Sequence, residues 1–250
     1  MIITVLNQRG GAGKTTVVEC LAVAWMLQRK RVLVINSDTL KTVDKWAARG
    51  AVTGAKHLPT VINILEWRLL ARQAKDLSTD YDRVLIDTPA NSTEVPLAAL
   101  GVCDLAVLPV RPGGSDIDCV EASYALVEMA QASINPNLSA RVLLNGVAMS
   151  TRIGKDHRAA MEEFARFPVL TSQLDAKAVY VEAQTAGETP LSYGANGAAR
   201  KQILELAEEI ESLLENEEDG NITTTSHRTD TRERRGADRA KARPEDRNVA

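Results

Sequence analysis

The sequence contains few cysteines and no long run of apolar residues. Its three cysteines, Cys20, Cys103 and Cys119, are odd in number and lack metal-ligand spacing, which favours free buried thiols in a reducing cytosol over disulfides or a metal centre. No apolar run reaches the length of a membrane span. Met1–Leu6 lacks both a basic region and a cleavage site, so it is typical of a buried strand rather than a signal peptide.

The chain also lacks a large excess of charge of either sign. Its formal net charge is −3 at pH 7, so bulk electrostatics require no nucleic-acid partner, and any such binding must come from a local patch. What is present is ordinary for a globular protein, because 44% of the 250 residues are hydrophobic and 25% are charged. This length and composition predict one α/β domain with one sizeable core.

Short, nearly continuous apolar runs alternate with longer segments that have helical periodicity. Such runs are typical of strands buried on both faces, as in a parallel sheet covered by helices. Strand alternating with helix implies right-handed crossovers, so we predict a single doubly wound, mostly parallel sheet flanked by helices. The predicted strands are Ile2–Leu6, Arg31–Ile35, Arg83–Ile86, Leu105–Val110 and Arg141–Leu144. The predicted helices are Thr15–Gln28, Ile117–Gln131 and Lys201–Leu214.

The composition changes near Glu215, and large apolar residues almost disappear from there to Ala250. Asn221–Ala250 carries eight Lys or Arg residues against five acidic ones, and such a segment cannot bury enough apolar surface to fold. We therefore predict a folded domain over residues 1–215 and a disordered, mildly basic tail over residues 216–250. The tail has two open interpretations: a solvated appendage without a specific role, or a weak electrostatic tether to DNA or a partner.

A glycine-rich segment with the sequence RGGAGKTT occupies residues 9–16, between the first predicted strand and the first predicted helix. This context is what a phosphate-binding loop requires, because backbone N–H groups and the positive end of the helix dipole converge on the phosphates. We expect Lys14 to bridge the β- and γ-phosphate oxygens of ATP, and the Thr15 hydroxyl to ligate Mg²⁺. The predicted nucleotide-binding residues of the loop are Gly10, Gly11, Ala12, Gly13, Lys14, Thr15 and Thr16.

The loop departs from the ordinary pattern G-x-x-x-x-G-K-[ST], which would place glycine where this chain has Gln8. A basic residue, two glycines, any residue and then Gly-Lys-Thr fit instead. This variant resembles the K-G-G-x-G-K-[ST] hallmark of the ParA/MinD family of deviant Walker ATPases. The resemblance spans about Met1 to Leu214 and implies a P-loop NTPase fold, with the small plasmid-partition ParA proteins as the most similar branch.

In that family the first lysine of the motif reaches across a two-fold dimer to the phosphates of the nucleotide in the other protomer. The corresponding residue here is Arg9, which keeps the positive charge and offers a planar fork suited to phosphate oxygens. The resemblance therefore implies that Arg9 is a catalytic cation acting across the dimer. The alternative is that Arg9 is simply a solvent-exposed residue.

Two acidic residues follow predicted strands at the sheet edge where doubly wound folds bind ligands. Asp87 ends an apolar run and resembles the family's Walker B aspartate, which implies that it holds the Mg²⁺ shell through water. Asp38 resembles the family's catalytic aspartate, which orients the attacking water; its alternative is the N-cap of a helix that starts near Lys41. The departures from the family's D-x-D-P-Q pattern at this strand end are Asn36, Thr39 and Leu40, and loss of the first acid favours slow hydrolysis.

Three further segments resemble the family. Leu108–Pro112 resembles its strand and proline-containing loop, and Val142–Asn145 resembles a strand whose terminal asparagine faces the adenine. The amide of Asn145 can donate and accept, which suits an adenine edge, although a turn-forming Asn before Gly146 is the alternative. Ala178–Ala183 looks like the C-terminal segment of plasmid-partition ParA proteins.

The resemblance implies a cytoplasmic, nucleoid-associated ATP hydrolase with weak, Mg²⁺-dependent activity. ATP-bound homodimers would bind nonspecific DNA, and a ParB-like or small centromere-binding partner would stimulate hydrolysis and release them. The alternative is a related ATPase that positions a protein cargo, or serves conjugation or secretion. A role at the membrane is disfavoured because the Arg-rich tail has no apolar face. Besides the tail, the candidate DNA contacts are Arg166, Lys177, Arg200 and Lys201, each of which has a solvated surface residue as its alternative.

Overall fold

The computed structural model describes residues 1–148, 151–194 and 197–215 of the chain. Contacts divide the chain into two units, Met1–Ile210 and Glu211–Ala250, and the fold below is that of the first unit. The tail predicted over residues 216–250 lies outside the described residues. The domain boundary at residue 215 and the disorder of the tail therefore stay predictions.

A single seven-stranded sheet forms the centre of the first unit, and every pairing between its strands is parallel. The central strands are rich in Val, Ile and Leu and are buried along their length, because helices cover both faces. The spatial order is β3-β2-β4-β1-β5-β6-β7, which places the end of β1 at a switch point of the topology. The strands are β1 (Ile2–Val5), β2 (Val32–Asn36), β3 (Thr60–Asn63), β4 (Arg83–Asp87), β5 (Leu105–Val110), β6 (Ser139–Val147) and β7 (Val169–Asp175).

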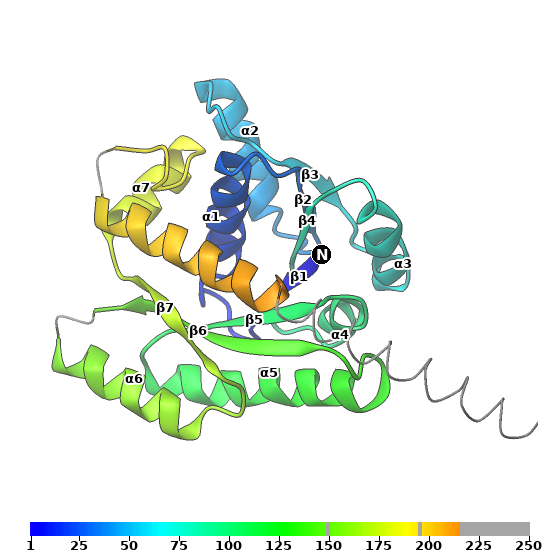
Figure 1. Ribbon diagram of the computed structural model, residues 1–250, viewed down its shortest axis with the longest axis vertical. Coiled ribbons are helices and arrows are strands. Elements are labelled where there is room, and N and C mark those ends of the chain that lie inside the picture. The colour runs from blue at the N-terminus through cyan, green and yellow to red at the C-terminus, as the bar shows by residue number, and fades with distance from the viewer. Residues whose placement is uncertain (149–150, 195–196, 216–250) are drawn as a thin grey trace, which may run out of the picture. The chain divides into compact units, whose positions relative to one another are not determined.

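Helices flank this sheet on both sides (Figure 1). On one side α3, α4, α5 and α6 contribute apolar side chains to a continuous core cluster with the strands. On the other side lie α1, α2, α7 and the helical residues 197–210. The predicted doubly wound α/β fold is confirmed. The helices with defined ends are α1 (Lys14–Leu27), α2 (Thr42–Thr53), α3 (Trp67–Leu77), α4 (Glu94–Leu100), α5 (Gly114–Ser133), α6 (Arg152–Phe164) and α7 (Ala178–Ala186).

The predicted strands are all present, but β3 and β7 were not predicted. These two strands lie at opposite edges of the sheet, where only one side pairs with a neighbour. The end residues of β3 are exposed and polar, and in β7 an exposed Thr and a partly exposed Ser and Gln separate two buried leucines. Neither edge strand therefore has the continuous apolar run that marks a strand buried on both faces.

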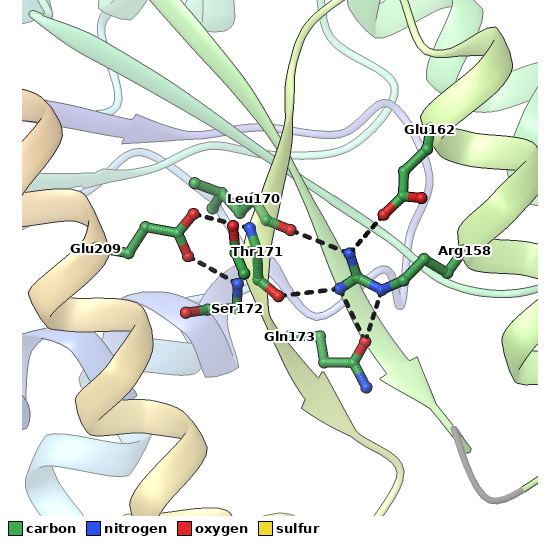
Figure 2. Close-up of polar contacts among 7 residues, drawn as sticks. All are labelled: Arg158, Glu162, Leu170, Thr171, Ser172, Gln173 and Glu209. Atoms are coloured by element: carbon green, nitrogen blue, oxygen red, sulfur yellow. Dashed lines mark hydrogen bonds and ion pairs between the residues drawn. The ribbon is translucent and has the colours of Figure 1, made fainter.

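Side chains from two helices form hydrogen bonds with an irregular segment of the edge strand β7 (Figure 2). The register between β6 and β7 shifts here, and the Glu209 carboxylate accepts the consecutive backbone N–H groups of Thr171 and Ser172, both at 2.7 Å. From α6, the Arg158 guanidinium donates to the Thr171 carbonyl at 3.1 Å and to the Gln173 side chain at 2.9 Å. The backbone N–H groups of Thr171 and Ser172 and the carbonyl of Thr171 are thus hydrogen-bonded within the chain, which leaves them unavailable for pairing with a strand of another molecule.

Helices α2 and α7 approach each other closely at a pair of glycines. A Cβ on Gly50 would lie 2.5 Å from the Gly187 carbonyl oxygen, and a Cβ on Gly187 would overlap the Gly50 backbone. Polar contacts support this approach, because Trp46 Nε1 donates to the Glu188 carbonyl at 2.9 Å and Arg49 Nη2 donates to the Gln184 carbonyl at 2.9 Å. The contact fixes α7 relative to the chain that follows β2.

Gly187→Ala is expected to lower the free energy of unfolding by about 2–4 kcal/mol, since it adds a backbone overlap to the cost of a left-handed conformation. Gly54→Ala is the matched control. Gly54 has φ 78° against 76° for Gly187, but among the described residues no atom beyond its chain neighbours lies within 4 Å of the position that its added methyl group would take. The free energy of unfolding of this control should fall by only about 1 kcal/mol. Urea denaturation followed by circular dichroism measures both, and equal losses would contradict the packing argument.

Candidate functional site

The glycine-rich loop connects β1 to α1 at the carboxyl edge of the sheet. Gly11 and Gly13 have φ of 80° and 93°, a left-handed conformation that side-chain-bearing residues rarely adopt. Gly13 is the N-cap of α1, and neither a capping side chain nor an acidic residue is found in the first turn of that helix. The amides and the positive end of the α1 dipole are therefore available to an anion, as the sequence predicts.

The Lys14 side chain folds back beneath the loop. It is only 7% exposed, and its Nζ donates to the backbone carbonyls of Asn7 at 2.9 Å and Arg9 at 3.1 Å. Burial lowers the pKa of Lys14, and the opposing charges of Asp87 and Asp38 raise it in part. Lys14 is thus a positioned ammonium group that an incoming phosphate would stabilise.

Thr15 and Asp87 meet directly beside this ammonium group. The Thr15 hydroxyl donates to Asp87 Oδ2 at 2.8 Å, although 72 residues separate the two in the chain. Asp87 is 1% exposed, and burial raises its pKa to about 7, while the Thr15 hydrogen bond and the Lys14 charge act in the opposite direction. Thr15 and Asp87, the two metal ligands predicted from the sequence, are therefore in direct contact in the fold.

The Thr15–Asp87 pair fits a magnesium ion held together with nucleotide phosphates. The second carboxylate oxygen of Asp87, Oδ1, is buried without a hydrogen-bond partner in the described structure. Mg²⁺ typically takes one or two protein oxygens and completes its shell with phosphate oxygens and water. The described residues contain no group of three or more His, Cys, Asp or Glu side chains able to hold a metal.

Asp38 lies at the same edge of the sheet, in the short connection from β2 to α2. It is close enough to Lys14 and Asp87 to affect the pKa of both. Its Oδ1 accepts the Leu40 backbone N–H at 2.9 Å, which closes a local turn. The N-cap of α2 is Lys41, with no side-chain cap, so the helix-capping alternative for Asp38 is wrong. The catalytic role stays a prediction that this position favours.

Arg9 is half-buried at the start of the loop. Its backbone N–H donates to Asn7 Oδ1 at 2.7 Å, and its carbonyl receives the Lys14 hydrogen bond. The backbone of Arg9 therefore helps to shape the loop and to hold Lys14. A role for the guanidinium across a dimer concerns a second protomer and stays a prediction.

Gln8, which stands where the ordinary motif has glycine, connects the loop to the segment after β4. Its Nε2 donates to the Ser92 carbonyl at 2.6 Å, and its own carbonyl accepts the Asn91 N–H at 3.2 Å. Its backbone N–H donates to the Ser123 hydroxyl of α5 at 3.0 Å. The departure from the ordinary motif is the only sequence signal that could have pointed to this role.

A cleft of about 460 Å³ opens beside the loop. The loop forms one wall at Gly11, Gly13 and Thr16, and Asn145 on β6 and residues of the segment 175–181 form the others. Because this cleft continues from the amides of the α1 N-terminus, its position suits the sugar and base of a nucleotide whose phosphates lie on the loop.

Asn145 and Arg111 hold the loop from the β5–β6 side. Asn145 Nδ2 donates to the Ala12 carbonyl at 2.7 Å, and Arg111 Nη1 donates to the Gly11 carbonyl at 3.2 Å. Asn145 lies inside β6, so the turn-forming alternative is wrong, and its contact with adenine stays a prediction. Arg111 was not predicted as a site residue, because an arginine after a strand carries no signal of which loop it will reach.

Two of the four candidate DNA contacts are engaged elsewhere. Arg166 forms ion pairs with Glu121 and with Glu128, the latter at 3.1 Å, so two acids offset its charge. Lys177 lines the cleft and pairs with Asp175 at 3.3 Å. Its position associates it with the nucleotide site more closely than with a DNA-binding surface.

The other two candidates are neighbours on the helical segment 197–210. The Arg200 guanidinium donates to the Leu191 carbonyl. Lys201 is largely exposed and pairs with Glu205 at 3.5 Å. The four cations thus come from three separate segments, and each has a polar partner. Binding of DNA by these residues stays a prediction.

Known proteins resemble this chain over most of its length. The family model described as VirC1 protein matches residues 1–218. The maintenance of carboxysome distribution protein A of Halothiobacillus neapolitanus is 25% identical over 210 residues, which cover 83% of this chain and 95% of that protein. The chromosome-partitioning ATPase Soj of Thermus thermophilus is 23% identical over 234 residues, which cover 83% of this chain and 94% of that protein.

A solved structure shares the fold. The septum site-determining protein MinD from Pyrococcus horikoshii, in complex with Mg-ADP, superposes with a TM-score of 0.67 and 22% identity, covering 86% of this chain and 98% of that one. Among the described residues, no helix is both long enough and apolar enough to cross a membrane. With its phosphate-binding loop, its parallel sheet and a family match over most of its length, the chain belongs to the VirC1 protein family, within the ParA/MinD group of P-loop ATPases.

Proposed function

We propose that this protein binds ATP with Mg²⁺ on the glycine-rich loop, hydrolyses it slowly, and uses the two nucleotide states to position a cargo. The observation that carries the proposal is the convergence of Lys14, Thr15 and Asp87 beneath one loop. A buried ammonium group, a hydroxyl and a carboxylate with one oxygen free of hydrogen bonds are the groups that phosphates and Mg²⁺ require.

Hydrolysis transfers the γ-phosphoryl group to water and yields ADP and phosphate, so the protein has mainly to position groups and offset charge. Lys14 and the loop amides stabilise the negative charge on the β- and γ-phosphate oxygens. Asp38 accepts a hydrogen bond from the attacking water and aligns it with the γ-phosphorus. When bound, Mg²⁺ supplies further neutralisation of the phosphate charge.

A dimer that forms on ATP and separates after hydrolysis converts this chemistry into a switch. Arg9 is the residue proposed to reach the nucleotide of the other protomer, because it keeps a cation at the first position of the loop motif. A planar guanidinium can bind two phosphate oxygens at once, which suits that role. Its greater bulk than the lysine of the family motif is consistent with slow turnover.

The names of the relatives indicate cargo positioning more broadly than plasmid partition. One relative is named for carboxysome distribution and another for chromosome partitioning. We therefore propose positioning of a protein or DNA cargo in the cytoplasm, with plasmid partition as one form of it. A partner protein bound to the cargo, ParB-like or of another kind, would stimulate hydrolysis.

The ATP-bound dimer is expected to bind nonspecific DNA and to release it with ADP. Co-sedimentation with plasmid DNA in ATP, in ADP and without nucleotide measures this, with gel filtration to follow the dimer. Nonspecific binding rests on counterion release, so raising salt from about 50 to 200 mM should weaken it by about 10³ if several phosphates are contacted. If the protein forms a dimer with ATP but binds no DNA at any salt concentration, the switch would act on a binding surface other than DNA. No nucleotide-dependent dimer would contradict the switch itself.

A further inference from the structure

The side chain of Asn36 holds the backbone of Asp38 at two points. Asn36 ends β2 and is fully buried. Its Oδ1 accepts the Asp38 N–H at 3.1 Å, and its Nδ2 donates to the Asp38 carbonyl at 3.1 Å. A single amide thus bonds to both polar backbone groups of the proposed catalytic residue, a task that needs a donor and an acceptor on one side chain.

The same amide is anchored to two other elements. Nδ2 of Asn36 also lies 2.9 Å from Asp44 Oδ2 on α2 and 2.7 Å from Asn63 Oδ1 on β3, so its two hydrogens are shared among these two oxygens and the Asp38 carbonyl. Asn63 Nδ2 in turn donates to Asp44 Oδ1, so both oxygens of that carboxylate are used. Asn36, Asp44 and Asn63 form a closed polar cluster that joins β2, α2 and β3 around the connection carrying Asp38.

The chemistry of the cluster requires an amide at position 36. An ionised Asp44 carboxylate can accept hydrogen bonds but has no hydrogen to donate. Asp44 lies in the first turn of α2, where the helix dipole favours a negative charge. A carboxylate at position 36 would supply no hydrogen for Asp44 and would set two like charges at hydrogen-bonding distance. The amide at position 36 and the acid at position 44 are therefore a matched pair.

We propose that Asn36 is a positioning residue for hydrolysis, which fixes the backbone of Asp38 so that its carboxylate meets the attacking water. This inference rests on the proposed ATPase activity. Asn36 stands where the D-x-D pattern has its first carboxylate, and the inference gives the amide at this position a function of its own. Asn36 lies at the end of β2 and acts on turnover through Asp38, whereas ATP is bound by the glycine-rich loop.

Asn36→Asp is expected to lower kcat by about 10-fold or more, because small displacements of an aligned group are costly in rate. The KM for ATP should change by less than about threefold, since ground-state contacts of the loop are retained. Asp44→Asn should have a smaller effect on kcat. The double variant N36D/D44N exchanges acid and amide, and it should recover at least about threefold of the kcat lost in N36D, as coupled residues do.

Asn137→Asp is the matched control. It makes the same chemical change at an exposed residue before β6, at the opposite end of the strands from the loop, and should turn over at the wild-type rate. Steady-state phosphate release gives kcat and KM, and titration with a fluorescent ATP analogue measures binding separately. Should N36D not fold, Asn36→Ser should show the same loss of kcat without loss of binding, because one short hydroxyl group cannot replace both amide contacts with the Asp38 backbone.

The outcomes separate this inference from the proposed function. An unchanged kcat in N36D overturns the positioning role and leaves the proposed ATPase intact. A double variant that is no faster than N36D overturns the matched pair of positions 36 and 44. A loss that falls on KM or on ATP binding overturns the positioning role as well, because Asn36 would then shape the nucleotide site. A wild-type protein that binds ATP without turnover overturns both.

Discussion

Lys14→Ala is expected to weaken ATP binding by at least about 100-fold, or about 3 kcal/mol, because it removes a charge-assisted hydrogen bond to the phosphates. The structure gives a specific reason. Lys14 is held under the loop by the carbonyls of Asn7 and Arg9, and its side chain is buried. Titration with a fluorescent ATP analogue measures the loss, and the nucleotide-dependent dimer should disappear with it.

Thermal unfolding distinguishes a lost ligand contact from a damaged fold. At about 100 times its dissociation constant, ATP should stabilise the wild type by about 2.7 kcal/mol through mass action. Lys14→Ala should unfold cooperatively without nucleotide but show no such shift on addition of ATP. Lys75→Ala, on the exposed surface of α3, is the control and should keep the full shift. A normal shift in Lys14→Ala would contradict the assignment of the loop.

The fold was predictable where strands are buried on both faces. The central strands are buried runs rich in Val, Ile and Leu, and the glycines before Lys14 identify the strand-to-helix turn. The edge strands β3 and β7 give no such signal. Part of what stabilises β7 comes from Arg158 and Glu209, which are distant in sequence and carry no pattern that predicts the contact.

The site was predictable to the extent that it is local. Spacing along the chain identified Lys14 and Thr15, and the end of an apolar strand identified Asp87. The residues that hold these groups come from other elements, and only the sheet order brings them together. Arg111 reaches the loop across 100 residues, and Asn36 meets Asn63 because β2 and β3 are paired in register. Sequence alone indicated Asn36 as a lost acid, whereas the structure shows it bonded to both polar backbone groups of Asp38.

Asp38→Ala is expected to bind ATP and form the ATP-dependent dimer, while its turnover falls by at least about 100-fold, the range for a group that positions the attacking water. The Asp38 carboxylate accepts the Leu40 N–H within its own turn, whereas Lys14 and Thr15 are held by other groups, so the phosphate-binding arrangement should remain. Phosphate release measures turnover, and gel filtration with ATP measures the dimer. Asp80→Ala, an exposed residue before β4, is the control.

Asp38→Asn separates the charge of Asp38 from its turn-forming role. An asparagine at this position still offers an oxygen to Leu40 N–H and so preserves the local turn, but it accepts a water proton far less readily. If the carboxylate aligns water, Asp38→Asn should be nearly as slow as Asp38→Ala. If Asp38→Asn turns over like the wild type while Asp38→Ala does not, Asp38 only shapes the connection between β2 and α2. Hydrolysis at the wild-type rate in both variants would mean that another group positions the water.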